Sequence, residues 1–370
     1  MLKIGPTSTE NIIDYVAGER EPFSSRAFTA VDSLVLSQLS YLHFDGIVPD
    51  SVHGAPVTIE EIAGRGTPDT LFRDVRDGES NRKLFAALAQ SPRFQKTGLT
   101  FYVNRLNFEE EKQFSAVTCL PGDGTVYAAY RGTDSTFVGW KEDFNMAFLT
   151  PVSSQQEGAA YLNLAGREFS CGIRVGGHSK GGNIAVYSSA ACEPDVQERI
   201  IEVFSHDGPG FREEFLQSPE YARIRGRIHK TLPQSAMVGM LLQHSETYTV
   251  VKSNRIGLMQ HDPFSWAVEN GDFVSMGAVN NSAMFMDETL NLWADSLDDR
   301  KRETFINTLY EVIKATDAKT IYDLTDHWQE KAAAALGAVR EMDEETRYFV
   351  LQTIGLLFRL AVRNLRATRK

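Results

Sequence analysis

The sequence has 370 residues, with 38 Lys and Arg against 49 Asp and Glu and a net charge of −11; this acidic balance excludes a general attraction to nucleic acid or anionic lipid. Hydrophobic residues make up 42% and charged residues 24% of the chain, which excludes a disordered chain, a collagen-like fibre and a coiled-coil rod. The three cysteines have no close spacing, so they support neither a disulfide framework nor a cysteine zinc site and favour a reducing compartment.

The first 130 residues predict helices followed by strands. Helical spacing of apolar residues predicts three helices, at 11–16, 32–42 and 81–90. Asp32 is expected to cap the second of them, and the polar, Gly- and Pro-containing residues 45–68 are expected to form a loop. Alternating patterns predict three strands, at 99–104, 113–120 and 125–131.

The next part of the chain alternates between helix and strand patterns. Helices are expected at 155–169, 180–192 and 212–217, and strands at 173–175, 200–205, 228–232 and 248–251. Such alternation predicts an α/β fold with a mostly parallel central sheet flanked by helices.

Strand patterns stop near residue 275, and helix-length segments follow. These segments cover 286–294, 300–315, 320–339 and 344–366. We therefore expect two domains, an α/β domain with a helical N-terminal entry at 1–275 and an α-helical C-terminal subdomain at 276–370. The most apolar stretch, 348–362, is shorter than the roughly 20 residues that cross a bilayer, and the N-terminus lacks a signal-peptide pattern. A cytoplasmic protein without a membrane span is expected.

A short motif with chemical meaning lies between a predicted strand and a predicted helix. Residues 177–181 read G-H-S-K-G and match the pattern G-x-S-x-G. On so sharp a turn the serine backbone is strained, and side chains at the two glycine positions would collide with the neighbouring strand and helix. Backbone N–H groups at the helix start favour a developing negative charge. This context favours a nucleophile elbow that presents Ser179, over a chance glycine-rich loop or a phosphate-binding turn.

A nucleophilic serine needs a base that takes its proton. In the α/β-hydrolase arrangement the acid and then the histidine follow the serine, on loops after later strands. His261 lies in a loop after the strand at 248–251, and it is the predicted base. His206 is the alternative.

The predicted acid is Asp207, which directly follows the strand at 200–205. This position is on the edge of the sheet where active sites form, although an aspartate before Gly-Pro is also typical of a simple turn. Residues 232–237, after the next strand, contain no carboxylate. Glu246 and Asp262 remain as alternatives.

An oxyanion hole needs two backbone donors. One is expected from Lys180, the residue after the nucleophile, and the other from Thr133, in the turn after the strand at 125–131. A simple strand-ending turn with Arg131 on the surface is the alternative interpretation.

Two short blocks resemble the fungal-type (class 3) triacylglycerol lipases: residues 130–133, Tyr-Arg-Gly-Thr, with Trp140 and Asp143 downstream, and the motif at 177–181. The stretch from Asp32 to about Trp266 is similar to an uncharacterised bacterial family of lipase-like α/β hydrolases. This resemblance implies the α/β-hydrolase fold and a serine hydrolase site. Residues 140–149 do not encode a clear amphipathic lid, so an intracellular esterase, lysophospholipase or thioesterase is expected in place of a secreted lipase.

The sequence thus predicts a serine esterase that cleaves a carboxylic or acyl ester through a Ser179–His261–Asp207 triad and an acyl-enzyme. No metal or organic cofactor is expected, and the expected partner is a small-molecule or lipid-like acyl ester. The alternative is a non-catalytic hydrolase-fold protein that binds an acyl ligand or a protein partner. A peptidase or acyltransferase with the same triad is a third interpretation.

Overall fold

The computed structural model describes residues 10–367 with several gaps. The gaps are 67, 74, 108–111, 134–141, 143–144, 147–149, 281–283, 286–287, 290–291, 294–295 and 317–327. Trp140 and Asp143 therefore lie outside the described residues. The same holds for most of the helix expected at 286–294 and for the first part of the one expected at 320–339.

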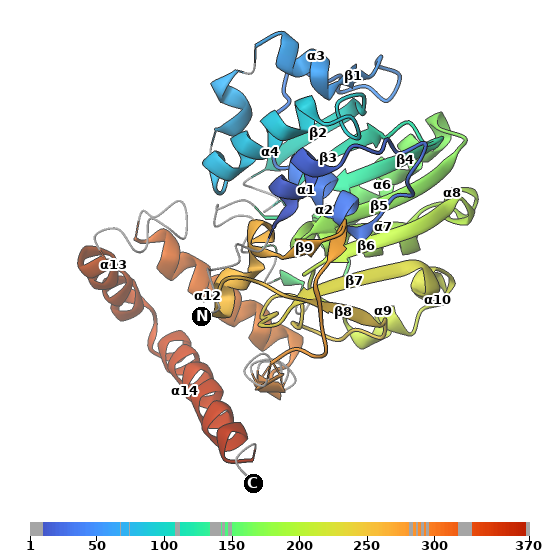
Figure 1. Cartoon of the computed structure of the whole chain (residues 1–370). Helices are drawn as coiled ribbons and strands as arrows, with labels where there is room; N and C mark the ends of the chain where they lie inside the picture. Colours follow the sequence, from blue (N-terminus) through green and yellow to red (C-terminus); the bar gives the residue numbers. More distant parts are fainter. Residues whose placement is uncertain are drawn as a thin grey trace, which may run out of the picture.

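A nine-stranded mixed sheet forms the centre of the described part of the chain (Figure 1). In spatial order the strands are β1 (Val57–Thr58), β2 (Gly98–Asn107), β3 (Lys112–Leu120), β4 (Thr125–Tyr130), β5 (Gly172–His178), β6 (Ile200–His206), β7 (Ile228–Pro233), β8 (Tyr248–Val251) and β11 (Ser275–Met276). The pairs from β4 to β8 are parallel, whereas β1 to β4 and β8 with β11 pair antiparallel. The expected α/β sheet is confirmed, with its parallel part confined to the centre.

Helices cover both faces of this sheet. The helix α2 (Ala30–Leu39) packs on β4, β5 and β6, and α6 (Ser153–Glu168) and α7 (Lys180–Ala191) pack on β3 to β6. Further α-helices in the described residues before 275 are α1 (Ile12–Gly18), α3 (Ile59–Gly64), α4 (Gly78–Gln90), α8 (Pro194–Glu198), α9 (Glu213–Leu216) and α10 (Pro219–Ile224). A small hairpin pairs β9 (Val268–Glu269) with β10 (Asp272–Phe273).

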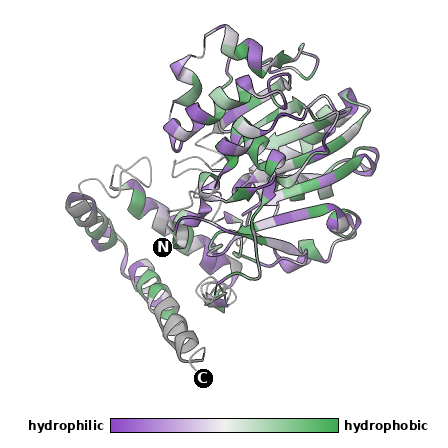
Figure 2. Cartoon of the chain, in the orientation of Figure 1, coloured by the Kyte–Doolittle hydropathy of each residue, from purple (hydrophilic) through white to green (hydrophobic). Residues whose placement is uncertain are grey.

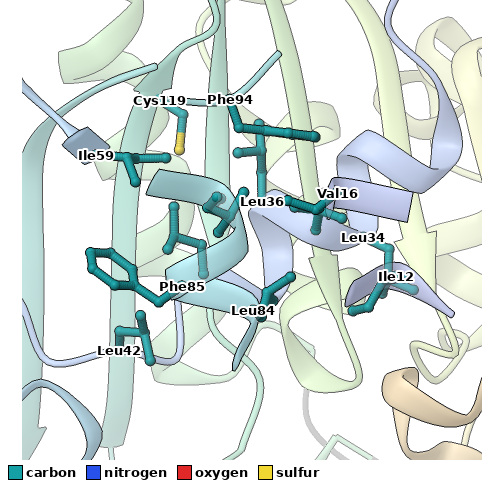
Figure 3. Close-up of a cluster of buried hydrophobic side chains, with 14 of the residues drawn as sticks. Ile12, Val16, Leu34, Leu36, Leu42, Ile59, Leu84, Phe85, Phe94 and Cys119 are labelled. Atoms are coloured by element: carbon teal, nitrogen blue, oxygen red, sulfur yellow. The ribbon is translucent and has the colours of Figure 1, made fainter. Parts of the chain in front are cut away.

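Apolar side chains fill a separate core on each face. Tyr127 and Ala129 of β4 belong to the core with α1, α2 and α4, whereas Ala128 and Tyr130 belong to the core with α6 and α7, as the alternation of strand side chains requires. Figure 3 shows part of the first core, where Leu34 and Leu36 of α2 lie among side chains of α1, α3 and α4. Hydrophobic residues accordingly concentrate on the central strands (Figure 2), because both faces of a covered parallel sheet are buried.

The start of α2 differs from the expected one. Thr29 is the N-cap, and Asp32 is the third helical residue, whose carboxylate accepts a hydrogen bond from the Thr29 backbone N–H. The two residues form a capping box. Asp32 also forms an ion pair with buried Arg93 at 2.6 Å. This ion pair links α2 to the segment after α4.

The loop expected at 45–68 contains two short elements, β1 and α3. Thr58 caps α3, and the Glu61 carboxylate accepts a hydrogen bond from the Thr58 backbone N–H. The strand β1 has only two residues and pairs with the first residues of β2. Elements this short leave little periodicity in a sequence.

In the described residues after 298 there are three helices: α12 (Asp299–Lys314), α13 (Trp328–Glu341) and α14 (Glu344–Ala367). They match helix-length segments expected there, and α12 packs against α13 and α14. A small core that includes Phe305, Ile306 and Val350 lies between α12 and α14. In Figure 1, α13 and α14 (red) extend away from the sheet. Across the described residues, every helix is too short or too polar to cross a membrane. The domain boundary at 275 stays a prediction.

Candidate active site

The motif at 177–181 forms the turn between β5 and α7. Ser179 is the N-cap of α7 and has φ 58° and ψ −132°, a conformation that costs a non-glycine residue free energy. Its backbone N–H donates to the His206 carbonyl at 2.9 Å, which anchors the turn to the end of β6. Ser179 therefore lies at the carboxyl end of β5, in the turn before α7.

The two motif glycines are required by close backbone contacts. A Cβ on Gly177 would lie 2.2 Å from the Gly181 carbonyl carbon, and a Cβ on Gly181 would lie 2.2 Å from the Tyr130 carbonyl oxygen. Both distances are far below van der Waals contact, and backbone atoms cannot yield as a flexible side chain can. The turn between β5 and α7 therefore packs directly on the end of β4.

Three side chains expected to act together form a continuous hydrogen-bonded chain. His261 Nε2 lies 2.9 Å from Ser179 Oγ, and His261 Nδ1 lies 2.6 Å from Asp207 Oδ2. Since a carboxylate only accepts hydrogen bonds, Nδ1 carries a proton, and Nε2 of the neutral ring accepts the Ser179 hydroxyl proton. Ser179 and His261 are each 8% exposed and Asp207 is fully buried. This geometry allows proton transfer from the hydroxyl to the imidazole.

Asp207 is held from two sides. Its backbone N–H donates to the Thr231 carbonyl at 2.8 Å, which extends the ladder between β6 and β7 past the end of β6. Its Oδ1 accepts a hydrogen bond from the Gly239 N–H at 3.0 Å, while Oδ2 faces His261. Asp207 has φ 49°, a left-handed conformation that Asp and Asn tolerate better than other non-glycine residues.

The loop that carries His261 is fixed by His178, the residue before the nucleophile. His178 Nε2 lies 2.9 Å from the His261 carbonyl, and His178 Nδ1 lies 3.2 Å from the Tyr41 hydroxyl. Burial, assisted by the nearby His261, holds the pKa of His178 well below its ordinary value, so its neutral ring donates through Nε2 and accepts from Tyr41. Sequence reasoning did not assign this contact, although His178 lies inside the motif.

The alternative base and acids have other partners. His206 Nε2 lies 2.9 Å from Ser33 Oγ, and burial, with a smaller contribution from His229, lowers the pKa of His206 to about 3. Glu246 accepts a hydrogen bond from Tyr221 and pairs with Lys230.

For Glu246, burial alone would raise the pKa, but the charge of Lys230 and the Tyr221 hydrogen bond hold it below its ordinary value. Asp262 pairs with Arg255 at 2.5 Å and caps the following turn through the Phe264 N–H. Burial raises the pKa of Asp262. Of the five groups considered as base or acid, only His261 hydrogen-bonds to the Ser179 side chain among the described contacts.

The two expected oxyanion donors lie on segments that meet at Ser179. Lys180 is the first residue of α7, where backbone N–H groups have no acceptor within the helix. A Cβ on Gly132 would lie 3.1 Å from Ser179 Cβ and 2.5 Å from the His178 carbonyl oxygen, so the turn that contains Thr133 packs against the elbow. Arg131, expected at the surface in the alternative interpretation, is 4% exposed.

A cavity of about 580 Å³ lies elsewhere, beside β1 and β2. Its lining residues fall in 45–50, at 57 and in 102–105, and none belongs to the Ser179–His261–Asp207 set. Within the described residues, no three His, Cys, Asp or Glu side chains gather in a way that could hold a metal ion.

Comparisons with known proteins give one family match. A family model described as Mbeg1-like matches residues 88–311, more than half of the chain, including all three residues of the hydrogen-bonded set. A search of curated proteins found no match. A solved structure titled "Rhizomucor miehei lipase propeptide complex, native" is similar at 15% identity and a TM-score of 0.36, covering 68% of this chain and 78% of that one. A likeness with this TM-score does not establish a shared fold.

Proposed function

The chain belongs to the Mbeg1-like family, and we propose that it is a serine hydrolase of the α/β-hydrolase fold that cleaves carboxylic or acyl esters. The observation that carries the proposal is the hydrogen-bonded chain from Ser179 through His261 to Asp207, with distances of 2.9 and 2.6 Å. These are the contacts that a nucleophile, its base and an orienting acid require. The order of the three residues along the chain, serine, acid, histidine, is that of α/β hydrolases.

In this proposal Ser179 Oγ attacks the ester carbonyl carbon while its proton passes to His261 Nε2. The carbonyl π electrons move to the oxygen, which accepts hydrogen bonds from the backbone N–H groups of Lys180 and Thr133. Collapse of this intermediate expels the alcohol, which takes the proton from His261 and leaves an acyl-Ser179 ester. A water molecule, deprotonated by His261, then releases the acid and restores the hydroxyl. Asp207 stabilises the imidazolium formed in both steps.

Ester hydrolysis by the Ser179→Ala variant tests the proposal. With p-nitrophenyl butyrate we expect kcat to fall on the order of 10³-fold or more, since the remaining groups cannot form the acyl-enzyme. Ser189→Ala, a buried serine of α7 whose hydroxyl donates to the Ala185 carbonyl, is the matched control and should keep parent activity. Hydrolysis by Ser179→Ala at the parent rate would refute the nucleophile.

A fluorophosphonate probe separates this proposal from a non-catalytic protein of the same fold. The parent is expected to be labelled on Ser179, because the probe reacts with a serine whose proton a neighbouring base removes. An unlabelled, folded parent would instead favour a protein that only binds an acyl ligand or a partner. The acyl-ester substrate class and the cytoplasmic setting remain predictions within this proposal.

A further inference from the structure

Next to the candidate nucleophile lies a buried ion pair that the triad does not use. The Lys180 ammonium lies 2.9 Å from Glu142 Oε2 and also donates to the Gln113 carbonyl at 3.1 Å. The side chains of Lys180 and Glu142 are 1% and 2% exposed. In the sheet order, Gln113 of β3 is separated from β5, which leads into Lys180, by β4. The Lys180 side chain therefore spans from the elbow past the end of β4.

The Glu142 carboxylate has further partners. Its Oε1 accepts the backbone N–H of Ser154, in the first turn of α6, at 2.8 Å, and its Oε2 accepts the Gln113 N–H at 3.3 Å. One carboxylate thus joins the elbow, β3 and α6. A buried ion pair of this kind is not needed for stability alone, since apolar residues of similar size stabilise a core equally well or better. Its distinctive effect is to fix the relative position of the segments that it joins.

The ion pair joins the elbow, which carries one expected oxyanion donor, to the connection between β4 and α6, which begins with the residues that carry the other. Lys180 carries one donor on its own backbone, and Glu142 follows Thr133 by nine residues on the same connection between β4 and α6. Gly132 already packs against the elbow, because an added Cβ would lie 2.5 Å from the His178 carbonyl oxygen. The ion pair anchors the far side of this connection to the residue that follows the nucleophile.

We propose that the Lys180–Glu142 pair positions the oxyanion hole by fixing the backbone N–H groups of Thr133 and Lys180 relative to each other. This inference rests on the proposed function. Neither charge touches the substrate; both act through the backbone donors. Because those donors bind the tetrahedral intermediate more strongly than the ester, loss of the pair should affect kcat and leave KM almost unchanged.

The double variant Lys180→Met/Glu142→Gln removes both charges and keeps similar side-chain volumes, so no unpaired charge is left buried. We expect kcat for p-nitrophenyl butyrate to fall by about 10- to 100-fold, with KM within about twofold of the parent. This fall in kcat does not exceed the one that follows removal of a whole oxyanion donor. The affinity of butylboronic acid, which adds to Ser179 Oγ and forms a tetrahedral anion, should fall by a similar factor. A merely structural pair would not change kcat and boronate affinity together at constant KM.

Lys230→Met/Glu246→Gln is the matched control. This pair is equally buried, with side chains 1% and 3% exposed, and it connects β7 to the segment before β8. It should lower the melting temperature comparably without the selective loss in kcat. If the test variant does not fold, Glu142→Asp replaces it: the charge is kept but drawn back by one methylene group, and kcat should fall at least threefold at unchanged KM.

The outcomes separate the two proposals. A parent whose ester hydrolysis does not depend on Ser179 overturns both. A Ser179-dependent parent, together with a folded test variant that keeps parent kcat and boronate affinity, overturns only the positioning role of Lys180 and Glu142. An equal loss of kcat in the Lys230–Glu246 control also overturns it.

Discussion

Replacing Asp207 by Asn should reverse the protonation of His261 with almost no change in shape. In the parent, Asp207 Oδ1 accepts the Gly239 N–H and Oδ2 accepts His261 Nδ1–H. An asparagine has one oxygen and one NH₂ group, and only the oxygen can accept from Gly239. The NH₂ group then faces His261 Nδ1 and requires it to be an acceptor. The ring proton moves to Nε2, which can no longer accept the proton of Ser179.

The size of the effect follows from this loss of the base. The corresponding Asp→Asn change in a serine protease triad lowers kcat by about 10⁴-fold, so we expect a loss of about 10³- to 10⁴-fold here. At 1.36 kcal/mol per factor of ten this is about 4–5.5 kcal/mol of transition-state stabilisation. The fold should be retained, because asparagine tolerates the positive φ of 49° at this position.

The assay is the steady-state hydrolysis of p-nitrophenyl butyrate, with the melting temperature as a measure of folding. Asp262→Asn is the control, since Asp262 is the neighbouring buried carboxylate, paired with Arg255; it should keep kcat within about threefold. A folded Asp207→Asn variant with kcat within tenfold of the parent would refute the assignment of Asp207 as the orienting acid.

Two further predictions concern Gly132 and His206. The Gly132→Ala variant should lose about 1–3 kcal/mol of stability by overpacking and at least tenfold in kcat, because its Cβ would lie 2.5 Å from the His178 carbonyl oxygen. Gly18→Ala is the control, since a Cβ there has nothing within 4 Å. A Gly132→Ala variant with the kcat and melting temperature of the parent would contradict the close packing. The pKa of His206 is about 3 in the folded protein and about 6.5 in the unfolded chain. As the pH falls, the unfolded chain therefore binds the proton first. The free energy of unfolding should then decrease below about pH 6.5, by up to about 1.4 kcal/mol per pH unit. His206→Gln should reduce that slope in urea unfolding between pH 6 and 4, and an unchanged slope would contradict a buried neutral His206.

The local pattern at the elbow allowed much of the candidate site to be predicted from the sequence. The motif at 177–181, with a strand before and a helix after it, predicted the turn at Ser179 because steric rules act over a few residues. Asp207 and His261 followed from their places after the strands that became β6 and β8. Their hydrogen bonds to each other and to Ser179 are long-range contacts that no local pattern specifies.

Other features depended on contacts that sequence patterns do not carry. Asp32 was expected as a helix cap, but Thr29, three residues earlier, takes that position and Asp32 pairs with Arg93. The ion pair of Lys180 with Glu142 joins residues 38 positions apart, and no local sequence pattern indicates it. The two-residue strands β1 and β11 form by pairing with the longer strands β2 and β8. Short-range periodicity in the sequence cannot indicate such pairing.

The backbone hydrogen bonds of Ser179 and Asp207 link the active-site geometry to the cooperativity of the whole fold. Their N–H groups donate to the carbonyls of His206, the last residue of β6, and of Thr231 in β7, so we expect these amides to be protected from deuterium exchange while the central strands stay paired. Regions of this kind open only with the global transition, unlike mobile loops. We therefore expect exchange of these two amides to require opening of the central strands, so that the backbones of Ser179 and Asp207 stay aligned for as long as the sheet is folded.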